Sequence, residues 1–191
     1  MKKDLKIISL IITITGILVL TWLIINRNII NLMEKPLSAI GNIPENYLMF
    51  LLGGGIVFYF VTLFLIKIHI KQNIKISWEL YLLPVLILLT LTIPYKEEFL
   101  LGKILHTMTG IIGAVLILFL MYKINKYYFP ENPLIQKITK NIPPITIIGT
   151  LILFITMGMN VIMQLFYLTT TLIWINLTAF SKPKQKKTKK G

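Results

Sequence analysis

Cysteine is absent from this chain of 191 residues, and acidic residues are scarce, with seven Asp and Glu in total. The lack of cysteine excludes disulfides, thiolate metal sites and cysteine nucleophiles. Only 14% of the residues are charged, whereas about 25% are charged in soluble domains. The chain is 55% hydrophobic, with a mean hydropathy of +0.78. This composition predicts an integral membrane protein.

The formal net charge of +13 comes from Lys and Arg residues that lie between apolar runs. Nucleic-acid binders instead gather their basic residues on one folded surface, so we expect the bilayer and no nucleic acid as the partner. The basic tail, 181–191, holds six lysines from Lys182 to Lys190. We expect these lysines to contact anionic lipids at the cytoplasmic face, each contributing about 1 kcal/mol.

The apolar runs are long enough to predict membrane-spanning helices, because a hydrocarbon core of about 30 Å needs roughly 20 residues. The last run, Ile145 to Phe180, has 36 residues and as one helix would measure about 54 Å. We therefore predict a break near Met157 to Asn160, where Gly158 suits a helix end and Asn160 an N-cap. The predicted all-α domain, 1–180, comprises helices at about 7–26, 47–66, 79–95, 103–122, 143–158 and 160–180.

The distribution of basic residues supports this helix count, because Lys and Arg accumulate in cytoplasmic loops. Six helices place 16 of the 20 basic residues on one side of the membrane, whereas five helices place ten on each side. The charge bias therefore predicts a polytopic bundle of six transmembrane helices with cytoplasmic N- and C-termini. Of the two histidines, His69 lies among lysines on the cytoplasmic side, where we expect an interfacial residue.

All seven acidic residues lie at segment ends or in loops, which disfavours an ion-coupled transporter. His106 is the ionisable residue closest to the membrane interior, about one turn below the outer surface. It shares one helical stripe with Gly110 and Gly113, which predicts that it points into the bundle. We interpret Gly54 as a close-packing position and Gln164 as an interhelical hydrogen-bonding residue.

Glu45, Glu97 and Glu98 are expected near His106 at the outer face. A histidine with several carboxylates suggests a metal site or acid–base site, but no H-x-x-x-H or H-E-x-x-H spacing accompanies it. We therefore predict no metal and no cofactor. Two interpretations of His106 stay open, structural hydrogen bonding and contact with a ligand.

Three segments together resemble a known family: "PLSAIGNIPENYLMFLLGGGIVF", "TIPYKEEFLLGKILHTMTGIIGAVLILF" and "NVIMQLFYLTTTLIW". They resemble the prokaryotic six-helix family designated domain of unknown function 998, which is similar to the Frag, DRAM and Sfk type membrane proteins. Ser38, Gly41 and His106 match residues typical of that family. Ala39 and Gln164 stand where acidic residues are expected, so two charges of the family pattern are missing. The resemblance implies a six-helix bundle without established enzymatic activity, with relatives tied to lipid handling and membrane trafficking.

The sequence thus favours a non-enzymatic protein of a prokaryotic cytoplasmic membrane. Its predicted outer-face pocket engages a lipid headgroup or a membrane partner and is formed by Ser38, Glu45, Glu97, Glu98 and His106. One alternative is a lipid-modifying enzyme in which His106 is the general base or a metal ligand. Another is a transporter of a small neutral molecule or lipid. The sequence leaves open whether the chain assembles with itself or with another protein.

Overall fold

The computed structural model describes residues 2–25, 33–75, 78–96, 98–128 and 130–182. Within these ranges the regular structure is helical, as the composition predicted, and contains no strand. The helices are α1 (Lys2–Ile25), α3 (Leu37–Gly41), α4 (Pro44–Lys71), α5 (Trp78–Thr92), α6 (Leu100–Tyr127), α7 (Pro133–Met157) and α8 (Val161–Phe180).

Five of the described helices are long and apolar enough to cross a membrane, namely α1, α4, α6, α7 and α8. The remaining long element, α5, is apolar but has only 15 residues, with Pro84 inside it. At 1.5 Å per residue it measures about 23 Å, which is less than the hydrocarbon thickness of a bilayer. The molecule is therefore built mainly from helices of membrane-spanning length.

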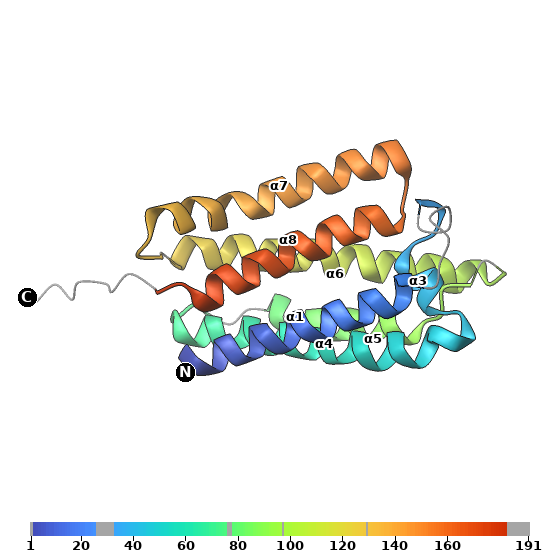
Figure 1. Cartoon of the computed structure of the whole chain (residues 1–191), viewed down its shortest axis with the longest axis horizontal. Helices are drawn as coiled ribbons and strands as arrows, with labels where there is room; N and C mark the ends of the chain where they lie inside the picture. Colours follow the sequence, from blue (N-terminus) through green and yellow to red (C-terminus); the bar gives the residue numbers. More distant parts are fainter. Residues whose placement is uncertain (1, 26–32, 76–77, 97, 129, 183–191) are drawn as a thin grey trace, which may run out of the picture.

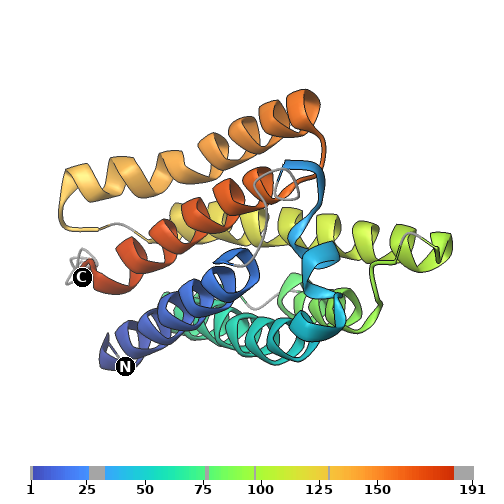
Figure 2. The ribbon, with the colours of Figure 1, turned by 45° about the vertical axis from the view of Figure 1, so that its right-hand side comes forward.

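The six longer helices form a closed ring in which each packs against its neighbours in sequence, and α8 returns to α1. Figures 1 and 2 show this arrangement, with α3 placed across one end of the bundle. The beginning of α1 and the end of α8 lie together at the opposite end (Figure 1). We call these the α3 end and the termini end of the bundle.

The interior of the ring is filled by large apolar side chains. Trp174 of α8 and Phe64 of α4 are both fully buried, and their rings meet edge to face with centroids 6.3 Å apart. Outward-facing positions are also apolar: Ile155 is 79% exposed and Leu18 is 61% exposed. An apolar outer surface on helices of this length fits contact with lipid rather than water.

The predicted division of the last apolar run lies between α7 and α8. Gly158 ends α7 with a φ of +71°, a backbone conformation that favours glycine. Asn160 caps α8, because its side-chain oxygen accepts a hydrogen bond from Met163 N at 2.9 Å. These two residues turn the chain sharply, so α7 and α8 pack as a helical hairpin.

Two predicted loops contain more helix than the sequence indicated. The predicted helix at 143–158 begins ten residues earlier, at Pro133, where Asn132 caps it by accepting from Leu134 N and Ile135 N. Pro143 and Pro144, which the prediction placed at the helix start, lie inside α7. At the α3 end, the predicted loop before α4 contains the short helix α3.

Candidate functional site at the two ends of the bundle

His106 of α6 is buried, and its side chain joins α6 to the end of α5. Its ring nitrogen Nδ1 lies 2.8 Å from the carbonyl oxygen of Ile93, the residue after the last of α5. A carbonyl only accepts hydrogen bonds, so Nδ1 carries the hydrogen and donates. Carbonyls at a helix C-terminus lack partners within the helix, and His106 supplies one here. The ring of Tyr95 packs edge to face against the imidazole, with centroids 5.6 Å apart.

The stripe that follows His106 along α6 faces α5, at ordinary van der Waals distances rather than in the close backbone approach that glycines permit. A Cβ atom added at Gly110 would lie 3.5 Å from Thr90, and one at Gly113 would lie 3.9 Å from Leu86. Beside this stripe, the hydroxyl of Thr90 donates to that of Thr109 at 3.0 Å. His106 is therefore part of the seam that holds the short helix α5 against α6.

The other residues of the predicted outer-face pocket are spread over this end. Ser38 is buried in α3, whereas Glu45 and Glu98 are exposed at the start of α4 and in the segment before α6. Glu97 lies outside the described residues. Within the described ranges, no hydrogen bond or ion pair joins any of these residues to His106, and no group of three His, Asp or Glu side chains could hold a metal ion.

Helix α3 is attached to the bundle by Gln164 and Gly41. The side-chain oxygen of Gln164, from α8, accepts a hydrogen bond from Leu37 N at 2.6 Å, at the first residue of α3. Gly41 lies so close to Phe50 of α4 that a Cβ atom there would collide with the ring. A similar approach joins α4 to α5, where a Cβ atom at Gly54 would lie 3.1 Å from Leu91. Gln164 thus caps α3 from a distant part of the chain.

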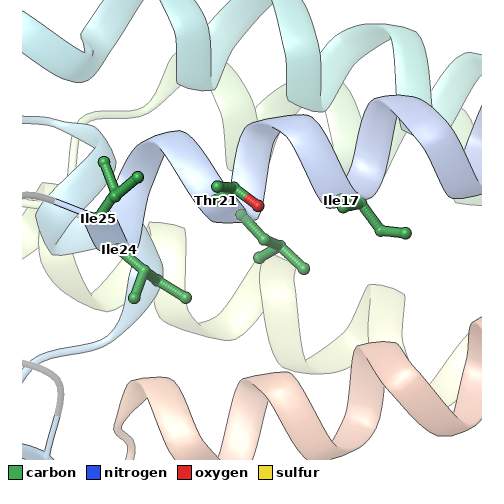
Figure 3. Close-up of a pocket in the computed structure, with 5 residues that line it drawn as sticks. Ile17, Thr21, Ile24 and Ile25 are labelled. Carbon is green, nitrogen blue, oxygen red and sulfur yellow. The ribbon is translucent and has the colours of Figure 1, made fainter.

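An open apolar groove of about 400 Å³ runs along the half of α1 nearest the α3 end. Its lining consists of Ile17, Leu20, Thr21, Ile24 and Ile25. In Figure 3 the labelled residues lie along one helix of pale blue ribbon, α1, with the orange ribbon of α8 facing it across the groove. Leu20 and Ile24 belong to the same apolar cluster as Leu165 and Leu168 of α8. All five lining residues of the groove belong to α1.

The termini end holds a buried polar network that the sequence did not predict. Asn125 of α6 donates from Nδ2 to the carbonyl of Thr139 at 2.9 Å and accepts from Trp174 Nε1 at 3.0 Å. The Thr139 carbonyl would normally accept from the amide of residue 143, but that residue is proline and has no N–H. Asn125 thus supplies the hydrogen bond that Pro143 removes. Two sequence features could have indicated this bond: an asparagine near the end of one predicted helix, Asn125, and the Pro143–Pro144 pair at the next.

Tyr128 closes the same end, just beyond α6. Its buried hydroxyl lies 2.6 Å from Ser181 Oγ, 2.9 Å from the Thr178 carbonyl and 3.0 Å from the Ser181 carbonyl. Burial raises the pKa of the Tyr128 phenol above its usual value. The phenol therefore stays neutral and joins the end of α6 to the end of α8.

Comparison with known proteins does not assign the chain to a family. No family model matches the chain, and neither a curated protein nor a solved structure matches it.

Proposed function

We propose that this protein is a non-enzymatic, multi-pass protein of a prokaryotic cytoplasmic membrane that binds a lipid beside α1. In this proposal all six longer helices cross the bilayer, and both termini lie in the cytoplasm. Two observations support the topology: the lysine excess at the termini end and the closed ring that includes α5. Membership of the family of unknown function 998 is part of the proposal and rests on the resemblance alone.

The apolar groove along α1 is the observation that carries the lipid proposal. Its lining is apolar except for Thr21, and it lies on a helix of membrane-spanning length. A groove at this depth is surrounded by hydrocarbon, so an acyl chain is the ligand whose chemistry fits it. Helix α3 contributes Leu37 and Ile40 to the apolar cluster against which Leu20 and Ile24 pack.

The lipid headgroup would then contact the α3 end, where Ser38 and Glu45 are located. His106 belongs to the separate seam between α5 and α6, and its Nδ1 is engaged by Ile93. We therefore assign His106 a structural role. The proposed headgroup contact is smaller than the pocket that the sequence suggested, because it does not include His106.

Native mass spectrometry tests lipid binding directly. The protein would be purified from a bilayer of phosphatidylethanolamine and phosphatidylglycerol as the parent chain and as two tryptophan variants. Thr21→Trp fills the groove, whereas Leu18→Trp adds the same bulk to an outward position of α1 that is 61% exposed. We expect several-fold less co-purified lipid in Thr21→Trp and no change in Leu18→Trp. Equal lipid retention in all three proteins would contradict the proposal.

The topology is tested separately by single cysteines, because the chain has none of its own. We expect a membrane-impermeant maleimide to label Glu45→Cys in intact cells, since Glu45 is exposed at the α3 end. Lys182→Cys, at the termini end, should react only after the membrane is permeabilised. The reverse pattern of labelling would invert the proposed orientation without affecting the lipid experiment.

A further inference from the structure

The end of α6 and the beginning of α7 lie together at the termini end (Figure 1). The bond from Asn125 Nδ2 to the Thr139 carbonyl, 2.9 Å long, holds these positions of the two helices at the same level. Lys126 and Lys140 directly follow the two bonded residues in the sequence, and both are exposed. The two lysines therefore lie at one level of the α6–α7 junction.

Helical geometry also places both lysines on the same side of this junction. Consecutive residues are about 100° apart around the axis of an α-helix. Because α6 and α7 run in opposite directions, one step along the chain from each bonded residue turns toward the same side of the contact. Asn125 and Thr139 are buried, whereas Lys126 and Lys140 are exposed. The side that the lysines share is therefore the outer surface of the bundle.

Two neighbours extend this basic surface. Lys137 is exposed and lies three residues before Lys140, hence on the same face of α7. On α6, Lys126 Nζ lies 4.9 Å from the ring centroid of Tyr122, one turn earlier. Tyr122 is itself exposed, as is common for tyrosines at the level of lipid headgroups. We call Lys126, Lys137 and Lys140 the α6–α7 lysine patch.

Apolar side chains continue from the patch toward the middle of the bundle. Leu151 follows Lys140 by eleven residues, or about three turns, so it lies on the same face of α7. Phe119 precedes Lys126 by seven residues, or about two turns, on the same face of α6. Both are exposed. A surface with cations at one end and apolar side chains along its length matches an amphiphile with a negatively charged headgroup.

We propose that the α6–α7 lysine patch binds an anionic phospholipid in the leaflet at the termini end. The lipid phosphate contacts the lysine ammonium groups, and its acyl chains lie along Leu151 and Phe119. Residues 122–140 contain four lysines and one acidic residue, Glu131, so the segment repels the ammonium of a zwitterionic headgroup such as phosphatidylethanolamine. The patch therefore selects phosphatidylglycerol over phosphatidylethanolamine.

This site is independent of the lipid proposed beside α1, because it is formed by other helices and lies at the other end of the bundle. It also differs from the basic tail, which was expected to attract anionic lipids through charge alone. A site built from folded helices instead predicts that binding depends on particular lysines. Lysines elsewhere at the same end should contribute much less.

Titration of phosphatidylglycerol into the whole chain in detergent, followed by native mass spectrometry, tests the patch. One protein combines Lys126→Gln with Lys140→Gln. The matched control combines Lys3→Gln with Lys75→Gln, which removes two exposed charges from the same end but outside the patch. We expect binding to weaken about tenfold in the first protein and by less than about twofold in the control. Lys126→Arg with Lys140→Arg keeps both charges and should bind as the parent does.

Four results would overturn the proposal. The first is equal weakening in both glutamine proteins, which would indicate a general effect of charge. The second is equal affinity of the parent for phosphatidylglycerol and phosphatidylethanolamine, and the third is loss of binding in the arginine protein. The fourth is a different occupant of the patch, either soluble glycerol phosphate that displaces the lipid or a second copy of the chain, seen as a dimer that only the Lys126→Gln and Lys140→Gln protein loses.

Discussion

The two ends of the bundle contain buried polar groups of different kinds. At the α3 end, His106 and Gln164 each hold a backbone group of a short element, the carbonyl of Ile93 and the amide of Leu37. At the termini end, Asn125 of α6 joins three helices, because it bonds to the Trp174 side chain of α8 and to the Thr139 carbonyl of α7. The first arrangement caps local structure, whereas the second joins the main helices of the bundle.

This difference predicts that substitutions at the termini end affect the stability of the whole bundle. Substitutions at the α3 end should affect mainly the element that the side chain caps. Loss of Asn125 would leave two buried polar groups on two other helices without a partner, whereas loss of His106 or Gln164 would leave one backbone group.

Asn125→Leu should be the most damaging of these changes. It leaves the Thr139 carbonyl and the Trp174 indole N–H without their partners, and we expect a loss of about 2–4 kcal/mol in the free energy of unfolding. The measurement is reversible unfolding in mixed micelles, monitored by tryptophan fluorescence.

Pro143→Ala supplies a matched background for that experiment. It restores an N–H at residue 143, which can bond to the Thr139 carbonyl within α7. Asn125→Leu should then cost about 1 kcal/mol less than in the parent chain. If the two costs are equal, Asn125 does not compensate for the proline.

His106→Ala should cost about 1–2 kcal/mol, because it removes one hydrogen bond and the packing of a buried ring on Tyr95. Hydrogen exchange should show the loss confined to the end of α5, around Ile93. The amount of bound lipid should stay unchanged, since the groove is lined by residues of α1 and not by α5 or α6. Loss of lipid at unchanged stability would instead return His106 to the ligand site that the sequence suggested.

Gln164→Leu should have the smallest effect, a loss of about 1 kcal/mol or less, because a single hydrogen bond to α3 disappears. Gln164→Glu keeps the acceptor oxygen and serves as the control. Faster hydrogen exchange at Leu37 in the leucine variant alone would support the capping role. Equal exchange in both variants and the parent would contradict it.

The sequence predicted those features of the fold that depend on length, apolar content and local capping. The break between α7 and α8 was predictable because Gly158 and Asn160 have strong local preferences for helix ends. The start of α7 was not predictable, because a Pro-Pro pair is typical of a helix boundary. Pro143 and Pro144 lie inside α7, where the distant Asn125 bonds to the Thr139 carbonyl. Tertiary contacts of this kind leave no local pattern.

The candidate sites show the same limit. The face that His106 shares with Gly110 and Gly113 followed from helical spacing, and this face packs against α5. No helical spacing fixed the positions of the carboxylates that were expected beside His106. The two that the structure describes, Glu45 and Glu98, are exposed in other segments. His69 was expected at the interface because its sequence neighbours are lysines, yet its side chain is fully buried.

The bond from Asn125 to Thr139 also has a consequence for how the protein is made. Until α6 and α7 come together, the Thr139 carbonyl lacks its partner, and within a membrane an unpaired carbonyl is costly. A chain whose synthesis stops before the α7–α8 hairpin assembles would likewise leave Asn125 without its two partners. Completion of the bundle therefore pairs polar groups that an unfinished chain would leave unsatisfied within the membrane.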